Sequence, residues 1–115
     1  MSNVEVIQGK WRIIRPAGEI DFSNVGELDA ALDTAAGESP KGFVIDLSGV
    51  TYFDSAGVRA ILYALKRVHT AGGKLALVVQ TYNVHKLLEA LNLEHIPGIM
   101  ICDSVDAAEQ TLSAD

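Results

Sequence analysis

Residues 42–70 constrain the fold more than any other part of the sequence, because the spacing of their apolar residues changes partway along. Residues 43–47 form a short β-branched and aromatic run, which is typical of a buried strand. Further along, apolar residues recur at helical spacing, at Val58, Ile61, Leu62, Leu65 and Val68. Between the two segments, Asp54 or Ser55 can cap the helix by accepting from its free backbone N–H groups. The sequence therefore predicts a strand-to-helix turn with a serine hydroxyl beside a carboxylate.

The segments before this turn and just after it carry strand and helix signals in alternation. Residues 4–17 indicate a β-hairpin with Gly9-Lys10 at its turn. A helix follows, whose apolar stripe is Val25, Leu28, Ala31, Leu32 and Ala35. Ala71-Gly72-Gly73 indicates the end of the helix that starts near residue 55. Residues 75–79 are entirely apolar, as expected of a central strand.

The last part of the chain continues the alternation. We expect a helix capped by Asn83, a strand at residues 99–102, and a final helix capped by Asp103 or Ser104. Alternating strands and helices of this length form right-handed crossovers onto a largely parallel sheet. The sequence thus predicts an α/β fold, a mixed β-sheet with an N-terminal hairpin packed with about four α-helices. The length predicts a single domain, residues 1–115.

Composition excludes several classes of function. The formal net charge is -6, from 15 acidic and 9 basic residues, which argues against nucleic-acid binding. No apolar run approaches the length of a membrane-spanning helix, and the first residues lack the features of a signal peptide, so we expect a cytoplasmic protein without direct membrane insertion. The single cysteine, Cys102, lies in an apolar run and is expected to be a buried core thiol.

Catalysis and metal binding have little support in the sequence. The histidines His69, His85 and His95 are scattered on segments expected to be exposed, and no two of them share a helical face. Glycine-rich phosphate-binding motifs and the nucleophile elbow are missing. Ser55 as a nucleophile would need a base, and no histidine lies near it in sequence. We therefore expect no enzyme activity, no cofactor and no metal.

The turn around Ser55 allows two interpretations from its residues alone. Asp54 and Ser55 can be simple helix caps, and Asp21 a local loop residue. Alternatively, Ser55 is modified or binds an anion, since helix N-termini attract phosphate. Under that interpretation Asp21 and Asp54, each at the end of an expected strand, lie at one edge of the sheet and orient Ser55.

A family resemblance favours the second interpretation. Residues 44–57, Val-Ile-Asp-Leu-Ser-Gly-Val-Thr-Tyr-Phe-Asp-Ser-Ala-Gly, resemble the signature of the STAS domain, in particular the bacterial anti-sigma factor antagonists, and Gly-Glu-Ile-Asp at residues 18–21 is similar to that family's second motif. The order of elements fits over nearly the whole chain. The resemblance implies that Ser55 is the phosphoacceptor and that nearby residues bind the partner or shape the site, namely Asp21, Asp54, Ala56, Gly57 and Arg59. Two of these depart from the family pattern: Ala56 replaces a common Ser or Thr, and Arg59 a common small residue.

The resemblance also implies a function. An anti-sigma factor antagonist binds an anti-sigma factor that is a serine kinase while its serine is unphosphorylated, and releases it once phosphorylated; a serine phosphatase resets the cycle. ATP then belongs to the kinase. Two alternatives share the fold: a STAS subunit of an ABC-type lipid transporter, and a partner-switching regulator of a non-transcriptional output such as secretion or biofilm formation.

Overall fold

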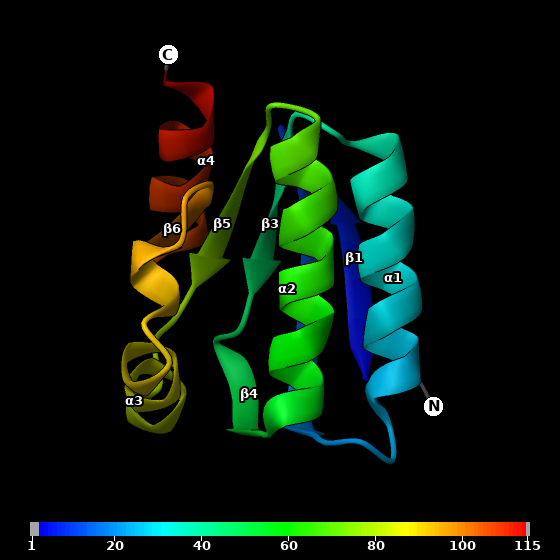
Figure 1. The fold of residues 1–115 in the computed structure, drawn as a ribbon, viewed down its shortest axis with the longest axis vertical. Coiled ribbons are helices and arrows are strands. Elements are labelled where there is room, and N and C mark those ends of the chain that lie inside the picture. The colour runs from blue at the N-terminus through cyan, green and yellow to red at the C-terminus, as the bar shows by residue number, and fades with distance from the viewer. Residues whose placement is uncertain (1–2, 115) are drawn as a thin grey trace.

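The computed structural model describes residues 3–114, and within that range it contains one mixed sheet and four α-helices (Figure 1). The strands are β1 (Val4–Gln8), β2 (Arg12–Ile20), β3 (Gly42–Asp46), β4 (Gly49–Phe53), β5 (Lys74–Val78) and β6 (Ile99–Cys102). The helices are α1 (Val25–Glu38), α2 (Ser55–Thr70), α3 (Tyr82–Ala90) and α4 (Val105–Ser113), with a short 3-10 turn at Leu93–His95. The predicted mixed α/β fold is confirmed.

The strand order is β1-β2-β3-β5-β6, and β4 pairs with β2 as well. β1 and β2 form the expected antiparallel hairpin, and the other pairs are parallel. β3 and β5 are adjacent and buried, because their residues are apolar on both faces. No helix in the described range is long and apolar enough to cross a lipid bilayer.

Helices cover both faces of the sheet. Figure 1 shows α1 and α2 side by side over one face, where they bury the larger core with Phe43, Ile45 and Leu77. Side chains alternate between faces along a strand, so Val44 and Ala76 point the other way and pack with residues of α4. The turn that contains Ser55 lies at the start of α2 and so borders this face of the sheet.

β4 is a strand that the sequence patterns did not separate from the turn that follows it. A short turn separates β3 from β4. In this turn the buried Asp46 accepts hydrogen bonds from the backbone N–H of Ser48 at 3.0 Å and from Arg15 Nε at 2.9 Å. β2 then changes neighbour, pairing with β3 through Ile13 and Ile14 and with β4 from Ala17 onwards. β2 therefore extends past β3, and its last residues, which pair with β4, lie at the end of the sheet where Ser55 is found.

The helix caps and helix ends predicted from the sequence are present, with one exception. α2 ends at Thr70, with Ala71 as its C-cap, in a Schellman motif in which Gly73 N–H donates to Val68 O at 2.8 Å and Gly72 has a φ of +83°. Ser104 caps α4 through the backbone N–H of Ala107. The prediction that Asn83 caps a helix is wrong, because α3 already begins at Tyr82.

Candidate functional site

Ser55 is the first residue of α2 and is exposed to solvent. Asp54, not Ser55, is the N-cap: its Oδ1 accepts from the backbone N–H of Ala56 at 2.9 Å. The backbone N–H of Val58 donates to Asp54 O at 3.2 Å and closes the first helical turn. The serine hydroxyl is therefore not needed to start the helix, and within residues 3–114 it has no hydrogen-bond partner.

Asp21 and Asp54 lie beside each other at the carboxyl ends of two parallel strands. Ile20 pairs with Phe53 in the last position of β2 and β4, and each aspartate follows one of these residues. The backbone N–H of Asp54 donates to Ile20 O at 3.2 Å, which ties the start of α2 to the end of β2. The predicted placement of the two aspartates at one edge of the sheet, next to Ser55 in the chain and in the strand pairing, is thus present.

Asp21 is held by its own loop. Its Oδ1 accepts from both the backbone N–H, at 2.9 Å, and the hydroxyl of Ser23. Its backbone N–H donates to Asn24 Oδ1 at 3.0 Å. The hydrogen bonds from Ser23 lower the pKa of the Asp21 carboxyl below its ordinary value of 3.8, because they favour the charged form. Asp21 is therefore a fixed negative charge at neutral pH.

Gly57 is buried under an aromatic ring. A Cβ atom at this position would lie 2.7 Å from Cζ and 2.8 Å from Cε1 of Phe53, the last residue of β4. Only a residue without a side chain allows the ring to pack against the first turn of α2. Gly57 thus sets how closely the helix start approaches the sheet.

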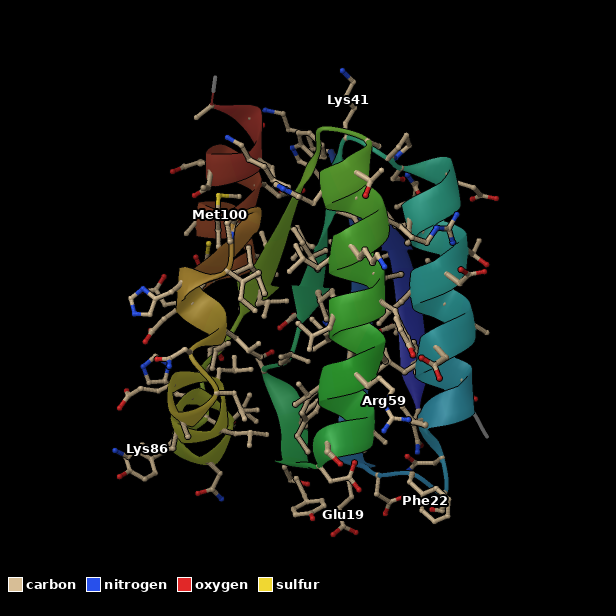
Figure 2. The ribbon with its side chains drawn as sticks, viewed as in Figure 1. Glu19, Phe22, Lys41, Arg59, Lys86 and Met100 are labelled. Carbon is tan, nitrogen blue, oxygen red and sulfur yellow. The ribbon has the colours of Figure 1, made fainter. Side chains whose placement is uncertain are left out.

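Ala56 is half-buried, whereas Arg59 is exposed on the first turns of α2. Figure 2 shows Arg59 at the same end of the molecule as Glu19 and Phe22. Arg59 forms no ion pair with any residue between 3 and 114. The first turns of α2 therefore present a cation that has no ion-pair partner within the described range.

Two exposed aromatic side chains border the site, and the sequence patterns did not single them out. Phe22 follows Asp21 and is 83% exposed, and Tyr52 lies two residues before Asp54 and is 51% exposed. Their signal in the sequence was weak but present, because Phe22 falls outside the apolar stripe of α1. Large apolar side chains exposed beside polar groups are typical of protein-binding surfaces.

Other residues considered from the sequence lie away from this site. The three histidines, His69, His85 and His95, are exposed. No group of three or more His, Cys, Asp or Glu residues in the described range is placed to hold a metal ion. Cys102 is half-buried rather than buried, because it lies on β6, at the edge of the sheet. The prediction of a core thiol is corrected accordingly.

The fold and this site define an α/β domain that displays a serine at a strand-to-helix turn, at the end of a mixed sheet. The profile of the STAS domain family matches residues 2–108. The chain belongs to the STAS domain family.

Three comparisons place the chain among relatives of known name. BtrV of Bordetella bronchiseptica, described as an anti-sigma factor antagonist, is 28% identical over 72 residues, which cover 63% of this chain; the match spans 62% of the length of BtrV. An anti-sigma factor antagonist from Mycobacterium paratuberculosis has a similar structure, with a TM-score of 0.85, 20% identity and coverage of 96% of this chain and 93% of that one.

The third comparison is with SpoIIAA, an anti-sigma factor antagonist and Bacillus cell fate determinant. Its unphosphorylated form has a TM-score of 0.74 and 17% identity, covering 96% of this chain and 99% of that one. Its phosphorylated form has a TM-score of 0.71 and 19% identity, covering 94% and 98%. Both forms of SpoIIAA therefore share the fold of this chain.

Proposed function

We propose that this chain is an anti-sigma factor antagonist that works by partner switching in the cytoplasm. It binds an anti-sigma factor that is also a serine kinase while Ser55 is unphosphorylated, and it leaves that partner once Ser55 carries a phosphate. A serine phosphatase restores the binding form. The chain itself is a binding protein, not an enzyme, and it needs no cofactor.

One observation carries this proposal: Ser55 is exposed at the start of α2 while Asp54 does the capping. Modification of the hydroxyl therefore costs the helix no hydrogen bond, and the phosphate joins a helix N-terminus that tolerates anions. The names of the relatives support the class of function, and SpoIIAA is a relative of similar fold solved in a phosphorylated form.

The chemistry of the switch is a phosphoryl transfer on the kinase. Ser55 Oγ forms a bond to the γ-phosphorus of ATP as the bond to ADP breaks, and a base on the kinase takes the hydroxyl proton. The product carries about 1.5 to 2 additional negative charges. These lie next to Asp54 and Asp21, so a partner surface that fits the neutral serine meets added negative charge.

The docking surface that we propose surrounds Ser55. It comprises the loop at Asp21 with the exposed Phe22, and the first turns of α2 with Ala56 and Arg59. Gly57 contributes from beneath, since it sets the position of the helix start against Phe53.

Replacement of Ser55 tests the switch. Ser55→Ala keeps the surface neutral and should bind the cognate kinase as the wild type does. Ser55→Asp should weaken binding by about 30-fold to several thousand-fold, because an unpaired charge at an interface costs about 2–5 kcal/mol. Calorimetry against the kinase measures both affinities, and the Tm of each variant checks that the fold is intact.

Gln110→Glu is the matched control, because it adds one negative charge on the exposed face of α4, across the sheet from α2. It should bind normally. Equal affinities of Ser55→Ala and Ser55→Asp would place Ser55 outside the interface and refute the charge switch. Incubation with kinase and ATP should add one phosphate at Ser55, and a phosphate on Ser48 or Ser104 would contradict the assignment.

The identity of the purified partner separates the remaining alternatives. Co-purification of a soluble serine kinase supports the proposed function or its variant with a non-transcriptional output. Co-purification of a membrane ATPase would instead identify a subunit of a lipid transporter.

A further inference from the structure

Arg59 differs from every other arginine in the chain. Arg12 pairs with Glu38 at 2.7 Å, Arg15 pairs with Asp46, and Arg67 pairs with Asp33. Arg59 is exposed and pairs with no carboxylate of the described residues. A guanidinium without an ion-pair partner in this part of the chain is available to an anion added nearby.

Three carboxylates, Asp54, Asp21 and Glu27, have donors of their own. Asp54 accepts from the backbone N–H of Ala56, and Asp21 accepts from Ser23. Glu27, in the first turn of α1, accepts from the backbone N–H groups of Asn3 and Val4. These bonds supply the three carboxylates with donors other than Arg59.

Ser55 and Arg59 stand four residues apart in one helix. Side chains at positions i and i+4 lie one above the other on the same helix face, within reach of each other. Ser55 is short and neutral, so it offers Arg59 no ion pair. A phosphate on Ser55 supplies three strong acceptor oxygens to a planar guanidinium, a combination that forms short charge-assisted hydrogen bonds.

We infer that phosphorylation of Ser55 captures Arg59, whose guanidinium donates to the phosphate along the first turn of α2. This inference rests on the proposed function for the presence of the phosphate. Phosphorylation then changes the docking surface in two ways at once: it adds an anion at residue 55 and withdraws the free cation at residue 59. A partner that uses Arg59 as an anchor loses that anchor when the phosphate arrives.

The test uses phosphoserine incorporated at position 55 during translation, so it does not depend on any kinase. The second pKa of the phosphate is measured by phosphorus NMR. In the wild type it should lie about 0.15 to 0.4 unit below its value in the Arg59→Gln variant, because an i,i+4 ion pair favours the dianion. Arg59→Lys should restore part of this shift, since it keeps the charge but not the planar fork.

Lys66→Gln is the matched control, because it removes an exposed cation from the same helix, about three turns away from Ser55. Its phosphate pKa should equal that of the wild type. The inference is refuted if Arg59→Gln leaves the phosphate pKa unchanged, or if Lys66→Gln raises it as much. Failure of the cognate kinase to label Ser55 would instead overturn the proposed function while leaving the measured pair intact.

Discussion

The two aspartates of the site resemble each other in sequence but differ in their surroundings. One carboxylate oxygen of Asp54 accepts a hydrogen bond from the backbone of α2 and caps the helix. Asp21 accepts two hydrogen bonds from Ser23 within its own loop, and these lower its pKa. Asp21 stays ionised around neutral pH because its pKa is lowered, so Ser55 lies near a constant negative charge. A phosphate added at Ser55 is repelled by this fixed charge, which takes up no proton around neutral pH.

Ser23→Ala tests the origin of the low pKa of Asp21. In the wild type the Asp21 carboxyl should titrate below pH 3.8, and in Ser23→Ala its pKa should move up toward that value, because the side-chain hydrogen bond to the charged form is lost. Carbon-detected NMR of the carboxyl follows both titrations. Identical pKa values in the two proteins would show that the Ser23 hydroxyl does not lower the pKa of Asp21.

The sign of the pH effect on stability follows from the same shift. A carboxyl whose pKa is lower in the folded protein stabilises the fold above its unfolded pKa and loses that contribution as the pH falls through the folded value. The wild type should therefore be more stable than Ser23→Ala at neutral pH, and the difference should shrink below pH 3.8. A difference that persists at the lowest pH would arise from another cause.

At the scale of elements, the contact between β4 and α2 decides how the site is presented. The ring of Phe53 occupies the space that a side chain at position 57 would fill. A glycine inside a helix lowers its stability by about 1 kcal/mol relative to alanine. Gly57 is nevertheless compatible with the fold, because its lack of a side chain lets the start of α2 pack tightly on the end of the sheet.

Gly57→Ala should consequently destabilise the protein by about 1–2 kcal/mol, because the overpacking cost exceeds the gain in helix propensity. Gly26→Ala is the matched control: it lies in the first turn of α1 with nothing within 4 Å of its added Cβ, and it should stabilise the protein by about 0.5–1 kcal/mol. Urea denaturation measures both free energies of unfolding.

Phe53→Leu tests whether the Phe53 ring is the reason that Gly57→Ala destabilises the protein. Gly57→Ala should cost less in the Phe53→Leu background than in the wild type, since the obstructing atoms are gone. If Gly57→Ala stabilises the wild type as much as Gly26→Ala does, the packing explanation fails.

At the scale of the whole molecule, the last helix is tied to the first hairpin across the sheet. The indole N–H of Trp11 donates to Ser113 Oγ at 3.0 Å, and its backbone N–H donates to Glu109 Oε2 at 3.3 Å. α4 also buries Ala108 and Leu112 against the sheet face opposite α1 and α2. Both cores share one sheet, so we expect them to unfold together.

Trp11 is the only tryptophan of the chain and reports on α4 directly. Its fluorescence and the far-ultraviolet circular dichroism should give the same urea midpoint, as a cooperative two-state transition requires. An earlier fluorescence transition would show that α4 detaches before the sheet unfolds.

The sequence alone determined the local features of this protein. Helical and strand periodicities, the cap at Asp54 and the glycine end of α2 depend on residues close together in the chain, so patterns of neighbouring residues predict them. The motif around Ser55 marked the site for the same reason. The half-buried Cys102 and the early start of α3 were not predictable this way, because edge exposure and packing of a helix depend on distant segments.

Only the tertiary structure decided how these features meet. β4 exists as a separate strand because β2 runs on past β3 and offers it a partner, a pairing that joins residues far apart in sequence. The same pairing brings Asp21 beside Asp54. Among residues 3–114, Arg59 is the arginine without an ion pair, whereas each of the other arginines lies within reach of a carboxylate on another element. Such long-range contacts depend on the free energy of the entire packed sheet, which no local pattern encodes.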